Sequence, residues 1–208
     1  MRLVVLGASK GVGKATLKLG LERGHRMIAV SRTDEGMGAT PNLNRYFFDV
    51  RDEARLRDTL KGADAVILSV GHPPTRKPVT LFSQGTNAVI GAMKAEGLRR
   101  LLVVTGIGAG DSRGHGGFFY DRILQPWLLR TIYEDKDRQE ELVAQSGLDW
   151  TLVRPGFLTN GRARGKFRTL TDMRGQKAGR ISRADVAAFL MACAEEPIYF
   201  GNTVNIFY

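Results

Sequence analysis

The sequence predicts a doubly wound α/β fold built on a mainly parallel, seven-stranded sheet, and three observations carry this prediction. Short apolar runs alternate along the chain with stretches in which apolar residues recur every three or four positions. A glycine-rich turn directly follows the first apolar run, and no internal repeat or linker breaks the alternation. Strands joined by helical crossovers lie parallel, with helices on both faces of their sheet. The 208 residues therefore fit one domain, 1–208.

The seven apolar runs are the expected strands. The first, residues 3–6, is apolar at every position, which is typical of a strand buried on both faces of a parallel sheet. The other six expected strands are residues 27–30, 46–48, 65–70, 101–104, 150–153 and 203–207.

Amphipathic stretches between these runs are the expected helices. After the glycine-rich turn, Leu17 and Leu21 stand four positions apart, and Gly24 follows as a C-terminal glycine. The later helices are expected at residues 52–61, 81–96, 126–146 and 184–194. Gly62, Gly97 and Gly147 stand where three of them should end.

The composition excludes several classes of protein. Cys193 is the only cysteine, and the three histidines lie far apart in sequence, so neither a disulfide framework nor a metal site is expected. No apolar run approaches the roughly 18 residues of a membrane helix. We therefore expect a cytoplasmic protein without a membrane partner, whose formal net charge is +10.

The glycine-rich turn spans residues 7–13, between the first expected strand and the first expected helix. At such a turn, backbone N–H groups and the positive end of the helix dipole favour a pyrophosphate. One glycine makes the tight turn, one lets phosphate approach the backbone, and one lets helix and strand pack closely. The context of strand, turn and helix predicts dinucleotide binding. The expected ligands here are Gly7, Ser9, Lys10, Gly11, Val12 and Gly13.

The choice between NAD and NADP depends on charge near the ribose 2′ position. Ser31 and Arg32 follow the second expected strand, and Lys10 within the turn offers a second cation for a dianionic phosphate. Asp34 and Glu35 follow closely and offer the alternative, a carboxylate for a free 2′-hydroxyl. The two cations favour NADP(H) over NAD(H).

Ligands of open α/β sheets bind at the carboxyl ends of the strands, so the residues that follow each strand are expected to share one crevice. Asp49 and Val50 are expected at the adenine, and Thr105 near the nicotinamide. Three further cofactor ligands, Ser69, Val70 and Gly71, follow the fourth strand, with His72 next to them on the substrate side. Pro155 follows the sixth strand and Phe157 lies just beyond it.

With these residues in hand, the chain resembles a short-chain dehydrogenase/reductase of the atypical, single-domain kind, in the neighbourhood of NmrA-like proteins and flavin reductases. The resemblance spans nearly the whole chain. The glycine spacing of residues 7–13 is similar to the standard short-chain branch. The other motifs that carry it are Gly85-Thr86-Asn87, Val103-Val104-Thr105-Gly106, the segment 146–156, and Ile181-Ser182-Arg183-Ala184-Asp185-Val186-Ala187.

The resemblance implies a Tyr-x-x-x-Lys pair, in which lysine lowers the pKa of a tyrosine that exchanges a proton with the substrate. Aligning on Lys136 places Ile132 at the tyrosine position. Tyr133 is one place off, about 100° around the helix, so it points elsewhere. Thr105, Tyr133 and Lys136 remain the catalytic candidates. Lys136 is expected either to bind the nicotinamide ribose or to lie on the helix surface, paired with Glu140.

A glycine-rich loop, residues 106–120, is the candidate for a mobile wall of the substrate pocket. Aromatic residues in and near it can stack on a planar substrate or can simply belong to the core. They are Phe118, Phe119, Tyr120, Trp127 and Phe157.

The segment 158–183 contains eight lysines and arginines and one acidic residue, Asp172. No nucleic-acid motif accompanies it, so no nucleic-acid partner is expected. The segment is expected on the substrate side, where its cations attract an anionic substrate or the cofactor phosphates, or keep a loop solvated.

The expected function is NADPH-dependent transfer of hydride to a small carbonyl, quinone or flavin-like acceptor. The displaced Tyr133 fits an acceptor that needs no strong protein acid. It also fits the alternative of a non-catalytic NADP(H) sensor like some NmrA-like proteins, and an epimerase-like isomerase is a third reading. The sequence fixes no oligomeric state.

Overall fold

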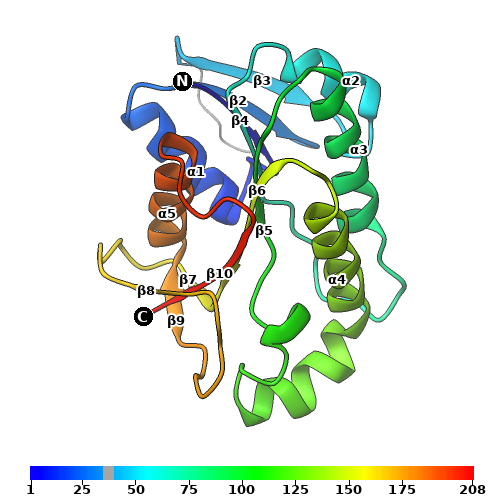
Figure 1. Ribbon diagram of the computed structural model, residues 1–208, viewed down its shortest axis with the longest axis vertical. Coiled ribbons are helices and arrows are strands. Elements are labelled where there is room, and N and C mark those ends of the chain that lie inside the picture. The colour runs from blue at the N-terminus through cyan, green and yellow to red at the C-terminus, as the bar shows by residue number, and fades with distance from the viewer. Residues whose placement is uncertain (35–39) are drawn as a thin grey trace.

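A computed structural model describes residues 1–34 and 40–208, and Figure 1 shows it as a central sheet between two layers of helices. Seven parallel strands and one antiparallel strand form the sheet, which confirms the predicted fold class. In spatial order the strands are β3 (Leu43–Phe47), β2 (Arg26–Ser31), β1 (Arg2–Leu6), β4 (Ala65–Leu68), β5 (Arg100–Val104), β6 (Asp149–Pro155), β10 (Asn202–Phe207) and β8 (Arg168–Leu170).

Helices α1 (Gly11–Glu22) and α5 (Arg183–Glu195) pack together on one face of the sheet. The other face carries α2 (Glu53–Leu60), α3 (Leu81–Ala95) and α4 (Arg130–Ala144). Within the described ranges, no helix is both long and apolar enough to cross a membrane.

Alternate residues of β1 belong to two different cores. Leu3 and Val5 lie in the core that includes α1 and α5, whereas Val4 and Leu6 lie in the core that includes α2 and α3. All four side chains are fully buried. This two-sided burial is the reason why the strand is apolar at every position.

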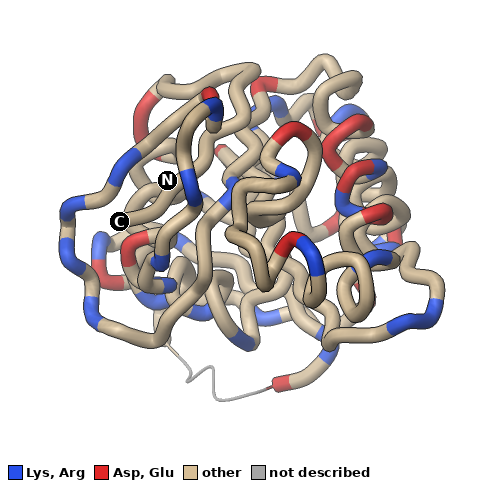
Figure 2. Tube along the Cα trace, turned by 90° about the horizontal axis from the view of Figure 1, so that it is seen from below, with Lys and Arg blue, Asp and Glu red and all other residues tan. Residues whose placement is uncertain are grey.

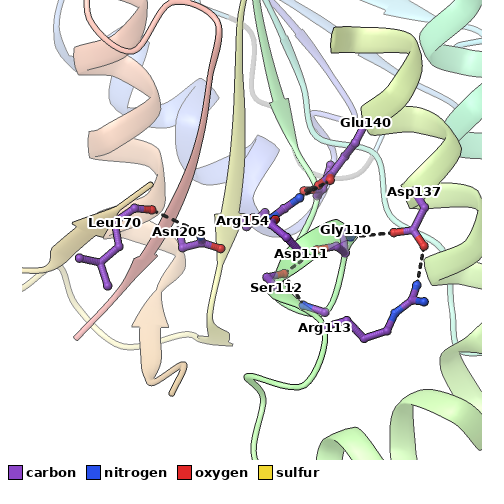
Figure 3. Close-up of polar contacts among 12 residues, drawn as sticks. Gly110, Asp111, Ser112, Arg113, Asp137, Glu140, Arg154, Leu170 and Asn205 are labelled. Carbon is purple, nitrogen blue, oxygen red and sulfur yellow. Dashed lines mark hydrogen bonds and ion pairs between the residues drawn. The ribbon is translucent and has the colours of Figure 1, made fainter. Parts of the chain in front are cut away.

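The eighth strand of the sheet is a difference from the prediction of seven. β8 pairs antiparallel with β10, and Asn205 Nδ2 donates to the carbonyl oxygen of Leu170 at 3.1 Å (Figure 3). A separate pair of short strands, β7 (Phe157–Thr159) and β9 (Arg180–Ser182), was also not predicted. Each of these three strands has only three residues and at most two apolar ones, so none contains the apolar run on which the prediction depended.

The helix expected at 126–146 begins earlier and changes its form. A π-helix, Tyr120–Leu129, contains Pro126 and leads directly into α4. The expected helix began at Pro126, a residue that has no N–H to donate and is common in the first turn of a helix. Here it lies inside the π-helix, and the regular α-helix starts only at Arg130.

The strand order reverses between β1 and β4, since later strands add on one side of β1 and earlier ones on the other. At such a switch point, the loops after the two strands diverge and leave a crevice. Gly7 ends β1 here with a φ of +89°, and a Cβ on it would lie 2.4 Å from the carbonyl oxygen of Ser69 after β4. Only a glycine fits this close approach.

Candidate functional site

A cavity of about 770 Å³ opens at the carboxyl ends of β1, β2, β4 and β5. It contains most residues that the sequence assigned to the cofactor, and one that it assigned to the substrate, His72. The predicted residues in its wall are Gly7, Ser9, Lys10, Gly11, Val12, Ser31, Arg32, Asp49, Val50, Ser69, Val70, Gly71, His72, Thr105 and Lys136. Gly13 and Pro155 are not in the wall.

The amino terminus of α1 forms one end of the cavity. Lys10 stands at the N-cap without capping the helix through its side chain, and the first turn has no acidic residue. Gly11 has a φ of +60°. Gly13 faces away from the cavity, and a Cβ there would lie 2.2 Å from the carbonyl oxygen of Gly7. Gly13 thus has the packing role expected of one glycine, and the turn presents bare backbone N–H groups suited to a pyrophosphate.

One cation, Arg32, follows β2 on the cavity wall. Thr33 also lines the cavity, and Ser31 Oγ donates to the carbonyl oxygen of Thr33 at 2.7 Å. Asp34, the alternative ligand for a free 2′-hydroxyl, is not part of the cavity wall. It forms an ion pair with Arg45, with 3.2 Å between Asp34 Oδ2 and Arg45 Nη1. The other alternative, Glu35, lies outside the described residues.

Asp49 lies on the wall after β3, next to Val50. Both of its oxygens accept hydrogen bonds from the guanidinium of Arg51, each at 2.8 Å. These bonds hold the pKa of Asp49 at about 2. The carboxylate is therefore a charged acceptor at neutral pH, as contact with an adenine amino group would require.

Lys136 is buried, which corrects the alternative of a helix-surface lysine. Its side chain points from α4 into the cavity, where Nζ donates to the carbonyl oxygen of Thr105 and lies 4.9 Å from the ring centre of Phe82. Burial lowers the pKa of Lys136 to about 8, although Glu140 and Asp135 act to raise it. Its ammonium group thus lies at the carboxyl end of β5, beside Thr105.

Glu140 does not form the expected ion pair with Lys136. Its carboxylate binds the guanidinium of Arg154 from β6, with 2.6 Å between Oε2 and Nη2 (Figure 3). Its other oxygen accepts from Thr105 Oγ1 at 2.6 Å. The hydroxyl proton of Thr105 is thereby directed away from the cavity, while the carbonyl of Thr105 receives Lys136.

Ile132, at the position of the tyrosine in Tyr-x-x-x-Lys, lies on the cavity wall one helical turn before Lys136. Tyr133 points elsewhere, as its offset predicted, and its hydroxyl accepts from Tyr120 Oη at 2.7 Å. Burial raises the pKa of Tyr133, which weakens it as an acid. The cavity therefore has an apolar side chain where a tyrosine acid would stand.

The aromatic residues assigned to the substrate do not line the cavity. Tyr120 packs edge-to-face against Phe157, with 5.1 Å between ring centres. Phe118 and Phe119 are 79% and 67% exposed and lie on the surface before the π-helix. The sequence could not show this, because the register of these side chains depends on where the π-helix begins.

The glycine-rich loop, 106–120, is fixed at several points and contributes no residue to the cavity wall. The backbone N–H of Gly110 donates to Asp137 Oδ1 at 2.8 Å, and the guanidinium of Arg113 pairs with the same carboxylate (Figure 3). Asp111 binds Arg154. These contacts attach the loop to α4 and β6, behind the floor of the cavity.

Several residues of the cavity wall were not predicted from the sequence. Leu158 and Arg183 come from the basic segment, and Arg183 stands in a motif that was noted only for its resemblance. The remaining wall residues that were not predicted are Val30, Thr33, Phe48, Pro73, Leu81, Phe82, Val104 and Ile132.

Figure 2 shows lysines and arginines in many parts of the chain, with acidic residues among them on the helices. No group of His, Cys, Asp and Glu in the described part of the chain could hold a metal ion.

Comparison with known proteins identifies the class of the chain. Residues 7–197 match the family model described as NAD(P)H-binding, and the chain belongs to this family. It therefore has an NAD(P)H-binding fold.

Individual relatives are distant but extend over almost the whole chain. An uncharacterized sugar epimerase, YhfK of Bacillus subtilis, is 25% identical over 99% of this chain and 91% of its own. The structure of ChuY, an anaerobillin reductase from Escherichia coli O157:H7, has a TM-score of 0.82 at 23% identity, over 100% of this chain and 97% of its own. A short-chain dehydrogenase/reductase from Veillonella parvula in complex with NADP has a TM-score of 0.82 at 12% identity, over 100% of this chain and 94% of its own.

Proposed function

We propose that this protein is an NADPH-dependent reductase that transfers hydride to a small carbonyl, quinone or flavin-like acceptor. The observation that carries the proposal is one cavity that joins a dinucleotide-binding turn to the buried Lys136 and has Ile132 in place of a tyrosine acid. Catalysis on such a site depends chiefly on positioning.

The residues fit NADP(H). Gly7 and Gly13 pack against neighbouring backbone atoms, so the turn stays bare and its N–H groups can receive the pyrophosphate. Arg32 and Lys10 are assigned to the 2′-phosphate, and the pairing of Asp34 with Arg45 removes a competing carboxylate. The NADP complex of the Veillonella parvula protein, whose fold is similar, supports this preference.

Near Lys136 the cavity wall is apolar, because Val70, Phe82 and Ile132 pack together there, and this part is assigned to the nicotinamide. Bound NADPH would supply the hydride there. Lys136 and the Thr105 carbonyl hold the ribose and keep the ring against these apolar side chains, which exclude water. Without a tyrosine beside the acceptor, reduction is favoured for a conjugated acceptor, whose product anion is stable enough to leave the cavity and take its proton from solvent outside it. The anaerobillin reductase among the structural relatives supports a reductase.

Two alternatives have specific support. Ile132 in place of a tyrosine fits a sensor that binds NADP(H) without turnover. The Bacillus subtilis relative described as an uncharacterized sugar epimerase favours an isomerase that uses bound cofactor.

The three functions separate in one series of assays. NADPH oxidation is followed with quinones, flavins and aldehydes as acceptors, and nucleotide sugars are tested for isomerisation without loss of NADPH. We expect steady NADPH oxidation with at least one conjugated acceptor. Tight binding without turnover would support the sensor instead, and isomerisation alone would support the epimerase.

A further inference from the structure

We infer that Arg183 is a ligand of the coenzyme diphosphate and closes the phosphate-binding turn from the side opposite α1. The inference rests on the proposed binding of NADP(H) and adds a binding residue from the far end of the chain, 170 positions beyond the glycine turn. It also gives a role to the motif Ile181-Ser182-Arg183-Ala184-Asp185-Val186-Ala187 and to part of the basic segment.

Arg183 is the first residue of α5 and lies across from the first residue of α1, Gly11. Its side chain lines the main cavity and also a second hollow of about 570 Å³ on the outer side of the turn. A Cβ on Gly11 would lie 3.8 Å from Arg183 Nε. The guanidinium therefore lies within reach of any anion held by the N–H groups of the turn.

The fold holds this guanidinium in place. Parallel pairing of β7 with β9 sets Thr159 beside Ser182, so that the next residues, Asn160 and Arg183, meet. Asn160 Oδ1 accepts from Arg183 Nη1 at 2.7 Å. Ser182 caps α5 by accepting from the N–H of Asp185, which fixes the backbone at the start of the helix.

Most N–H donors of the Arg183 guanidinium have no acceptor among the described residues. Among the described residues, Asn160 is its one hydrogen-bond partner, and no carboxylate pairs with it. Asp185 is two positions away, but its carboxylate accepts from the N–H groups of Arg164 and Gly165 and from Tyr208. An arginine placed in this way can donate two parallel bonds to a phosphate.

The diphosphate is the part of the coenzyme to which we assign Arg183. The 2′-phosphate is assigned to Arg32 at the end of β2, with Lys10 as its second cation, whereas Arg183 Nε faces Gly11, where the backbone N–H groups of α1 begin. NADPH and NADH share the diphosphate and differ only at the 2′ position. A diphosphate ligand must therefore act equally on both coenzymes.

The test measures dissociation constants of NADPH and NADH by calorimetry for wild type, Arg183→Gln, Arg183→Lys and Arg180→Gln. We expect Arg183→Gln to weaken both coenzymes by the same factor, about ten- to a hundredfold. Arg183→Lys keeps the charge but not the paired donors, and should show a smaller loss. Arg180 is exposed on β9 and outside both hollows, so Arg180→Gln removes the same charge and should change either constant by less than about twofold.

Equal affinities of wild type and Arg183→Gln would overturn the inference, and so would a loss confined to NADPH. Thermal melting of each variant without coenzyme separates loss of binding from loss of fold, and Arg183→Lys gives the same comparison if Arg183→Gln is unfolded. The proposed function fails differently, because wild type would then bind neither coenzyme or would bind NADPH without reducing any acceptor.

Discussion

Arg154 and Glu140 form a buried ion pair beneath the cavity floor, with Arg154 Nε 3.0 Å from Oε1 and Nη2 2.6 Å from Oε2 of the carboxylate. Their side chains are 5% and 8% exposed. Through Thr105, the pair connects β6 and α4 to the strand end that receives Lys136. A buried pair of this kind is costly to break, because the buried Arg154 would keep only one carboxylate partner among the described residues, the exposed Asp111.

Glu140→Gln is therefore expected to lower the free energy of unfolding by about 3 kcal/mol. Chemical denaturation measures this difference. Glu141→Gln, at the exposed neighbouring position of α4, is the control and should stay within about 0.5 kcal/mol of wild type. The double variant Glu140→Leu/Arg154→Met removes both charges and should recover part of the loss. Equal stabilities of Glu140→Gln and Glu141→Gln would contradict the role of the pair.

Lys136 makes the stability of the coenzyme-free protein depend on pH in the alkaline range. Its pKa is about 8 in the folded protein against 10.5 ordinarily, so between these values the unfolded chain binds more protons and stability rises with pH. Below about pH 8 the ammonium is charged in both states, and the cost of burying it is present in full. Relative to Lys136→Met, wild type should gain about 3 kcal/mol between pH 8 and pH 10.5.

Denaturation at a series of pH values checks this gain. Lys94→Met replaces an exposed lysine of α3 and should leave the alkaline profile as it is in wild type. A constant difference between wild type and Lys136→Met across this range would show that burial does not shift the titration of Lys136.

Two glycines of the phosphate-binding turn should differ in their tolerance of alanine. The added Cβ at Gly13 meets the backbone carbonyl of Gly7, which cannot move without shifting β1, so Gly13→Ala should cost about 3 kcal/mol or fail to fold. At Gly11 the nearest atom, Arg183 Nε, would lie 3.8 Å from the added Cβ, an ordinary contact distance, and only the φ of +60° opposes a side chain, at about 1 kcal/mol. Denaturation of the two variants gives the order, and the reverse order would contradict this account of the packing.

Patterns local in sequence predicted the fold and the residues that line most of the cavity. The apolar run of β1 reports burial on two faces, and the turn from Gly7 to Gly13 carries its glycines at positions where the backbone needs them. The start and end of α3 were predicted to within one residue of Leu81–Ala95, because its apolar spacing and the glycine after it are also local signals.

Contacts between distant segments decided the rest. The spacing of Lys136 and Glu140 allowed a surface ion pair as well as a ribose-binding lysine. In the structure Lys136 is buried and Glu140 pairs with Arg154 of β6, a contact that local spacing could not predict. Tyr133 pairs with Tyr120 across the start of an unpredicted π-helix. Arg183 reaches the glycine turn because β7 pairs with β9, and both strands, at three residues each, are too short to be recognised from sequence.

Arg32 should decide which coenzyme is preferred. Arg32→Ala removes a charge-assisted contact with the 2′-phosphate, so NADPH affinity should fall by about ten- to a hundredfold while NADH affinity changes by less than about twofold. Calorimetry with both coenzymes measures the two constants, and Arg26→Ala, at the opposite end of β2, controls for loss of positive charge. Equal weakening of both coenzymes would assign Arg32 to a shared part of the molecule. A loss confined to NADPH at Arg32, beside an equal loss for both coenzymes at Arg183, would place the 2′-phosphate at the end of β2 and the diphosphate at the glycine turn.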